Sequence, residues 1–236
     1  MNMEINFKSN TYLTKIPKKK KVKAGSIIGT CAGVGTALAL IGKHQGAKVF
    51  KKPDLNKWNK PKDWEINKIN FEEKEILALS GSSVVGGLIG GGLFDEKENI
   101  KPKVREGVFQ MIANMIVPII CVGGGIRIFD KLISPKLNIS KPKQNIIKGI
   151  MTIGTLAAGA IGGNYIGNIL NEKVFNSKKK RKLELKDLSG HLDDSCLALT
   201  LITQGKGIFG KIASRFIPVA LLIPGFETGQ KTKNDA

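Results

Sequence analysis

Four stretches of the sequence contain no charged residue, and they constrain the fold more than any other feature. They cover 24–42, 76–94, 107–126 and 149–170, and each is about 20 residues long. The whole chain is 24% charged, with a formal net charge of +19, so these windows contrast with their lysine-rich surroundings. A helix of about 20 apolar residues crosses a bilayer, and 18 or more without charge mark a candidate span. The windows therefore predict four transmembrane helices.

A soluble fold is the alternative, because helices that are apolar on every side also occur in the cores of large proteins. A chain of 236 residues leaves much of its surface exposed even when it is folded. The residues between the windows are mostly lysine-rich connections, which are too few to cover four such helices. The sequence therefore favours an all-α, polytopic helical membrane protein.

Glycine is frequent in the windows, most of all in residues 80–94, which read SGSSVVGGLIGGGLF. Glycine costs about 1 kcal/mol against alanine in a soluble helix, but in membranes small residues let helix backbones approach closely. Small residues four positions apart share one helix face. We therefore expect about four glycine-rich transmembrane helices in two antiparallel hairpins, although 28 glycines also produce some such spacings by chance. The expected packing residues are Gly25, Gly29 and Gly33, then Gly86 and Gly90 in a row with Ser82, and Gly159, Gly163 and Gly167, while Ser83, Gly87 and Gly91 form a parallel row.

Amide side chains lie at matching depths in the third and fourth windows. Gln110 and Asn114 lie near the start of one, and Asn164 and Asn168 lie near the end of the other. Pro118 cannot donate to the carbonyl of Asn114, which therefore needs another partner. The spacing predicts an intramembrane polar cluster in which these four amides form hydrogen bonds between the two helices. A polar vestibule open to the cytoplasmic side is the alternative.

The charge pattern divides the chain into a membrane domain and its flanks. We expect a basic cytoplasmic tail at 1–23, the membrane domain at 24–170, a basic linker at 171–191, an amphipathic or re-entrant C-terminal segment at 192–226, and a disordered tail at 227–236. A fifth span at about 208–225, with its basic side chains reaching the interface, is the alternative for the C-terminal segment. In NFEEKEIL, Asn70 and Glu73 have the spacing of a capping box that begins the second helix.

Basic flanks suggest the orientation and the partners. Lysine-rich flanks stay in the cytoplasm, so we expect the N-terminus on the cytoplasmic side. We expect the membrane to be a bacterial inner membrane. A cleaved signal peptide is the competing interpretation of the first window. The run KKKRK at 178–182 resembles a nucleic-acid patch, but behind a span it is more simply an anchor for anionic lipid headgroups. The expected partners are the lipid bilayer and a second copy or another membrane protein, not nucleic acid.

Motifs that could carry chemistry are weak. GKGIFG at 205–210 matches a dinucleotide fingerprint but lacks the surrounding alternation of strands and helices. His191, Asp193, Asp194 and Cys196 are metal-ligand types, yet they equally suit the start of a helix. The windows contain no Asp, Glu, Lys, Arg or His, which counts against proton relays and ion-coupled transport. We therefore assign no catalytic, cofactor-binding or metal residue and no cofactor.

The sequence leaves three classes of function. The leading one is a non-enzymatic membrane scaffold or assembly protein whose helices pack through glycine. A channel or small-solute transporter is the alternative, which requires a continuous polar stripe through two or more helices. A membrane-bound enzyme is the second alternative, which requires convergent acid, base or metal-ligating groups at one depth.

Overall fold

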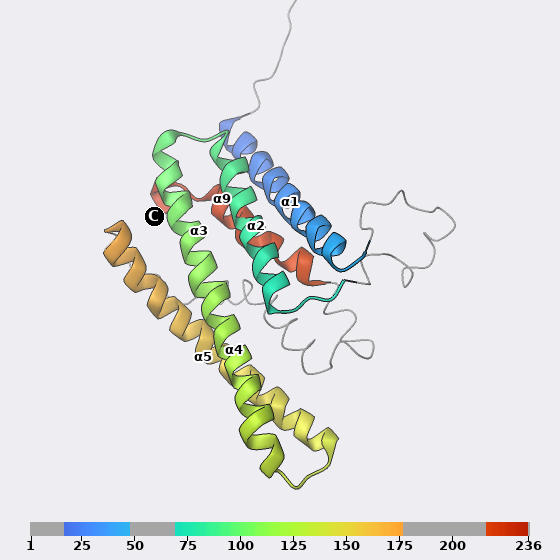
Figure 1. Ribbon diagram of the computed structural model, residues 1–236. Coiled ribbons are helices and arrows are strands. Elements are labelled where there is room, and N and C mark those ends of the chain that lie inside the picture. The colour runs from blue at the N-terminus through green and yellow to red at the C-terminus, as the bar shows by residue number, and fades with distance from the viewer. Residues whose placement is uncertain (1–16, 48–68, 177–215, 236) are drawn as a thin grey trace, which may run out of the picture.

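Every regular element in the described part of the chain is a helix (Figure 1). The computed structural model describes residues 17–47, 69–176 and 216–235. The elements in chain order are α1 (Lys18–His44), α2 (Glu73–Gly92), η3 (Lys97–Asn99), α3 (Ile100–Met111), η4 (Ile112–Ile116), α4 (Val117–Ile128), η5 (Phe129–Ile133), η6 (Ser134–Lys136), α5 (Lys141–Phe175), α9 (Leu222–Gln230) and η7 (Lys233–Asp235). The predicted all-α class is confirmed for these residues.

Four stretches of helix are long and apolar enough to cross a membrane. They are Lys18–His44, Glu73–Gly92, Lys97–Lys136 and Lys141–Phe175, and each covers most or all of one charge-free window. The first, third and fourth extend into lysine-rich flanks, because lysine is a good helix former. A charge-free window therefore marks the part of a helix that fits lipid and not the ends of the helix itself.

The third of these stretches is continuous from Lys97 to Lys136, although it contains Pro118. The wide turn η4 lies directly before this proline, and the N–H of Val117 donates to the carbonyl of Ile112. A proline ring clashes with the carbonyl four residues back in a regular α-helix. A local π-turn changes this spacing, so the helix continues past Pro118 without ending.

The N-cap of the second helix lies two residues later than predicted. Glu72 is the N-cap, and its backbone N–H donates to the Glu75 carboxylate at 3.1 Å in a reciprocal capping box. Asn70 lies against the end of α1, where its N–H donates to Gln45 Oε1 at 2.7 Å and its carbonyl accepts from Gln45 Nε2 at 2.8 Å. The expected Asn70–Glu73 box is therefore wrong, because Asn70 connects α1 to α2.

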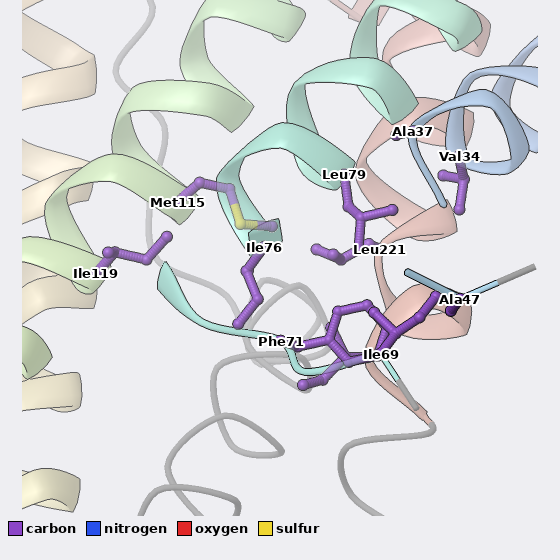
Figure 2. Packing of buried hydrophobic residues seen from close by; sticks show 11 residues of the cluster. Val34, Ala37, Ala47, Ile69, Phe71, Ile76, Leu79, Met115, Ile119 and Leu221 are labelled. Atoms are coloured by element: carbon purple, nitrogen blue, oxygen red, sulfur yellow. The ribbon is translucent and has the colours of Figure 1, made fainter. Parts of the chain in front are cut away.

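An apolar cluster joins the end of α1, the start of α2, the α3–α4 helix and the helix that leads into α9. Ile76, Leu79, Met115 and Leu221 are almost completely buried there, and Figure 2 shows them facing one another. The cluster fixes the C-terminal helix against α2, η4 and α4.

Large apolar side chains also cover the outer faces of the long helices. On α5, Ile146, Ile150, Ile153 and Ile161 are all more than 60% exposed. Their spacing of four, three and eight places them on one face of the helix. Soluble monomers rarely expose so large an apolar surface, whereas lipid would cover it. The exposed faces and the four long helices together support membrane integration.

The C-terminal helix differs from the expected layout. Residues 216–220 are helical and lead through Leu221 into α9, which passes alongside α1 and α2 (Figure 1). The helix reaches Gln230 and is followed by η7, where the sequence analysis placed a disordered tail from 227. Small residues at its end pack against α2, and this contact holds the helix together past 226. Residues 1–16 of the predicted tail at 1–23, residues 177–191 of the linker at 171–191 and residues 192–215 of the segment at 192–226 lie outside the described residues. Residues 18–23 of that tail belong to α1, and residues 171–175 of that linker belong to α5.

Candidate functional site: small-residue contacts, a polar line and a charged cavity

Glycines bring α1 and α2 into backbone contact. A Cβ added to Gly29 would collide with the carbonyl of Gly86 and lie 2.9 Å from the Cα of Gly90. Gly25 meets Gly90 in the same way, and Gly33 meets Ser82, so the two helices run in opposite directions. At each predicted glycine of this pair, an added Cβ would collide with the backbone of the facing helix.

The parallel row on α2 contacts α9. Gly87 lies against the carbonyl of Gly225, and Gly91 lies against that of Gly229. The Ser83 hydroxyl donates to the carbonyl of Leu221. Because both numbers rise together along these contacts, α2 and α9 run parallel. The helix α2 therefore contacts α1 through one small-residue face and α9 through the other.

The glycines of α5 face the π-turn region of the third long helix. A Cβ at Gly159 would lie 2.7 Å from the Cα of Pro118, and one at Gly163 would collide with the carbonyl of Ala113. One at Gly167 would lie 2.6 Å from the ring of Phe109. The side of α5 opposite its exposed isoleucines thus packs against α3, η4 and α4.

A line of four buried polar residues follows one face of α3 into η4. The polar line consists of Lys103, Glu106, Gln110 and Asn114, at spacings of three, four and four. Asn114 Nδ2 donates to Gln110 Oε1 at 2.6 Å. Gln110 Nε2 donates both to Glu106 Oε1 at 3.0 Å and to Glu227 Oε2, on α9, at 2.8 Å.

These contacts join only two of the four amides of the predicted polar cluster. Gln110 and Asn114 are bonded to each other. Asn164 and Asn168 are half-buried on α5, beside the glycines that contact Ala113 and Phe109, and both amides have interaction partners. A direct bond between the two pairs of amides stays a prediction.

Lys103 is the most deeply buried ionisable group of the polar line, with none of its side chain exposed. Its ammonium lies 2.8 Å from Asp95 Oδ2, 2.6 Å from the carbonyl oxygen of Gly229 and 2.9 Å from that of Lys231. The ammonium thus donates hydrogen bonds to the two carbonyls and forms an ion pair with Asp95. The carbonyls belong to the end of α9, where helices leave carbonyls without an internal partner. Lys103 therefore joins α9 to α3.

Asp95 completes this junction. Burial raises the pKa of its carboxyl, but hydrogen bonds from Lys103, Asn99 and the Glu96 N–H, with the nearby positive charge, lower the pKa below 3.8 overall. Oδ1 accepts from the Glu96 N–H and from Asn99 Nδ2, both at 2.8 Å. Asp95 is therefore ionised near neutral pH and balances the charge of Lys103.

A cavity of about 900 Å³ opens at the end of the bundle where α1 begins and α9 ends. We call it the mouth cavity. Its lining residues are Lys18, Lys19, Val22, Lys23, Asp95, Glu96, Asn99, Glu106, Glu227, Gln230, Lys231, Thr232 and Asn234. Lys231 pairs with Glu106 at 3.1 Å, and Lys18 pairs with Glu96 at 2.8 Å. Glu106 also belongs to the polar line, so the cavity and the line are continuous.

The polar line ends at Asn114. Residues 115–126 carry no charged or amide side chain, and Met115 and Ile119 belong to the apolar cluster with Ile76 and Leu221 (Figure 2). Polar groups therefore line one end of the bundle, and an apolar layer follows. This arrangement can hold a polar group that enters from the mouth cavity.

The charged residues of this site were missed in the sequence because they lie in the connections beside the windows. Lys103 and Glu106 share a helical face with Gln110 and Asn114, a spacing that was available from the sequence. Glu227 lay in the tail that was expected to be disordered. His191, Cys196 and GKGIFG lie outside the described residues, within which no group of three His, Cys, Asp or Glu side chains could hold a metal ion.

Comparison with known proteins adds no relative, since no family model, curated protein or solved structure matches the chain. The class of the protein therefore rests on its own features. Its described residues are all-helical and include four long apolar helices that could cross a membrane.

Proposed function

We propose that the chain is a polytopic membrane protein that acts as a non-enzymatic scaffold or assembly partner, with its helices in two antiparallel, glycine-packed hairpins. The contacts of α2 carry this proposal. One small-residue face meets α1 and the other meets α9, through glycine and serine backbones. Such close packing is typical of helices in membranes, where small residues replace the hydrophobic effect as the means of association.

The outer faces support a role in assembly. Gly35 on α1 and Gly154 on α5 have no atom within 4 Å of an added Cβ, so a neighbouring helix can approach there. The surrounding outer surface is apolar. A second copy of the chain or another membrane protein would pack against these faces within the bilayer. We place the N-terminus and the mouth cavity on the cytoplasmic side of a bacterial inner membrane.

Two measurements test this proposal. Washing membranes with alkaline carbonate should leave the chain in the pellet, and release into the supernatant would contradict membrane integration. Mass measurement of the protein purified in detergent, after crosslinking in the membrane, should give a complex larger than one chain. A monomer without any crosslinked partner would contradict the assembly role.

A solute channel or transporter is a second candidate, favoured by the continuity of the mouth cavity with Gln110 and Asn114. The apolar layer beyond Asn114 means that transport needs a second conformation. Cysteines placed singly at 114 and at 119 separate the two roles. A water-soluble thiol reagent added during transport should modify both in a transporter, and only the cysteine at 114 in a scaffold with a one-sided cavity.

A further inference from the structure

The mouth cavity is lined by equal numbers of positive and negative side chains. The positive ones are Lys18, Lys19, Lys23 and Lys231, and the negative ones are Asp95, Glu96, Glu106 and Glu227. Three of the lysines come from the first two turns of α1, and one of them, Lys18, pairs with Glu96 of the α2–α3 connection. The carboxylates come from the α2–α3 connection, α3 and α9. The cavity therefore has a lysine wall on α1 and a carboxylate wall on the other elements, and the ion pairs Lys18–Glu96 and Lys231–Glu106 neutralise part of each charge.

The helix dipoles follow the same separation. The helix α1 begins at Lys18, so its positive end lies at the lysine wall, and α9 ends at Gln230, so its negative end lies at the carboxylate wall. A helix end favours a charge of opposite sign within about one turn. An anionic group is thus stabilised beside α1, whereas the carbonyls at the end of α9 already bind the Lys103 ammonium.

We propose that the mouth cavity binds a zwitterion that carries a phosphate and a primary amine, the chemistry of a phosphoethanolamine headgroup. Lys19 and Lys23 bind the phosphate, since neither is engaged in an ion pair within the described residues. The carboxylate of Glu227, oriented by Gln110 at 2.8 Å, accepts hydrogen bonds from the amine. A simple anion or a simple cation would meet one wall of its own sign, whereas the zwitterion complements both walls.

The position of the cavity agrees with a lipid as the source of this group. The charge-free window of α1 begins at 24, directly after Lys23, and that of α2 ends at 94, directly before Asp95. The cavity therefore lies where the apolar parts of two helices end, which is the headgroup level of a bilayer. This part of the inference rests on the proposed membrane integration, whereas the charge pattern of the cavity does not.

Lipid binding to the full-length chain in detergent tests the inference. Native mass spectrometry gives dissociation constants for phosphatidylethanolamine, for phosphatidylglycerol, which has the phosphate without the amine, and for phosphatidylcholine, whose methylated amine cannot donate a hydrogen bond. Phosphatidylethanolamine should bind about tenfold more tightly than either, the effect expected of one charge-assisted hydrogen bond. Equal affinities for the three lipids would overturn the proposal.

Charge-neutral variants assign the two walls. Glu227→Gln keeps an oxygen that can accept from Gln110, and it should weaken phosphatidylethanolamine binding about tenfold without weakening phosphatidylglycerol binding. The double variant Lys19→Gln/Lys23→Gln should weaken both. Lys43→Gln, at the opposite end of α1, is the matched control and should weaken neither. An unchanged preference for phosphatidylethanolamine in Glu227→Gln, with unchanged thermal stability, would refute the amine site.

Free phosphoethanolamine distinguishes the source of the ligand. If free phosphoethanolamine displaces phosphatidylethanolamine at concentrations near the dissociation constant of the free compound, the cavity binds a soluble zwitterion. Failure to compete, with lipid binding intact, would assign it to the lipid. The carbonate wash separates this inference from the proposed function, because a chain released by carbonate could still show the headgroup preference.

Discussion

Replacing Lys103 by methionine removes the charged group that joins α3 to the end of α9. Methionine has a similar length and fills the same space, so the change acts mainly on polar contacts. It leaves the Asp95 carboxylate and the carbonyls of Gly229 and Lys231 without their shared donor. Breaking a buried ion pair by removing one partner costs about 3–5 kcal/mol.

The lower end of that range applies here. Asp95 keeps its hydrogen bonds from the Glu96 N–H and Asn99, and it borders the mouth cavity, from which water can reach it. We therefore expect a loss of about 3 kcal/mol in the free energy that holds α9 in place. That loss corresponds to an increase of about 100-fold in the fraction of chains with α9 detached.

A cysteine at Thr228, which is completely buried, reports this detachment in a chain whose native cysteines are replaced by serine. Its rate of modification by a thiol reagent should rise about 100-fold in Lys103→Met. Lys101→Met changes an exposed lysine of the same helix and serves as the control, with an unchanged rate. If the reagent modifies the cysteine equally fast in both variants, Lys103 does not hold α9.

Four further predictions follow from the same contacts. The pKa of Asp95 is lowered from 3.8 by its folded environment, so its ionised form stabilises the fold above that pH, and this contribution is lost as the pH falls below it. A pH titration of thermal stability should show this acid step in the native chain and not in Asp95→Asn. Gly87→Leu should lower the free energy of unfolding by at least about 3 kcal/mol, because the new side chain meets a backbone carbonyl that cannot move aside. Gly35→Leu, in open space, should leave the melting temperature nearly unchanged. Similar melting temperatures for the two variants would contradict the packing. Asn114→Leu and Asn164→Leu should show a coupling energy of about 0.6–2 kcal/mol in a double-mutant cycle, and strictly additive losses would refute their contact. A reporter that is active only outside the cytoplasm should be silent when fused after Lys182, and activity there would reverse the orientation or change the number of spans before it.

The helices could be predicted from the sequence because exclusion of charge is a local property. Each charge-free window lies largely within one long helix, and the small residues four positions apart lie at the close helix contacts. The helix ends could not be read in this way, since lysine continues a helix as readily as leucine does. The window 107–126 predicted a helix that continues through Pro118, but it gave no sign of the π-turn that precedes the proline.

The polar contacts were harder to predict, because they join residues that are distant in sequence. Lys103 appeared to belong to an exposed connection, and only the end of α9 makes its burial favourable. The short apolar runs near 216–230 gave no sign that they would pack along α2. Glycine spacing on α2 did show two faces, yet the partner of the second face became clear only when Gly225 and Gly229 were placed beside it.

The two faces of α2 also set an order of events during synthesis. The first face can meet α1 as soon as α2 leaves the ribosome, because α1 precedes it in the chain. The second face must wait for α9, the last of the described α-helices to be made. In that interval Gly87 and Gly91 lie open to lipid or to other helices. We expect a chain that stops before residue 216 to keep this face uncovered and to be degraded faster than the full chain, which a pulse-chase comparison of the two can measure.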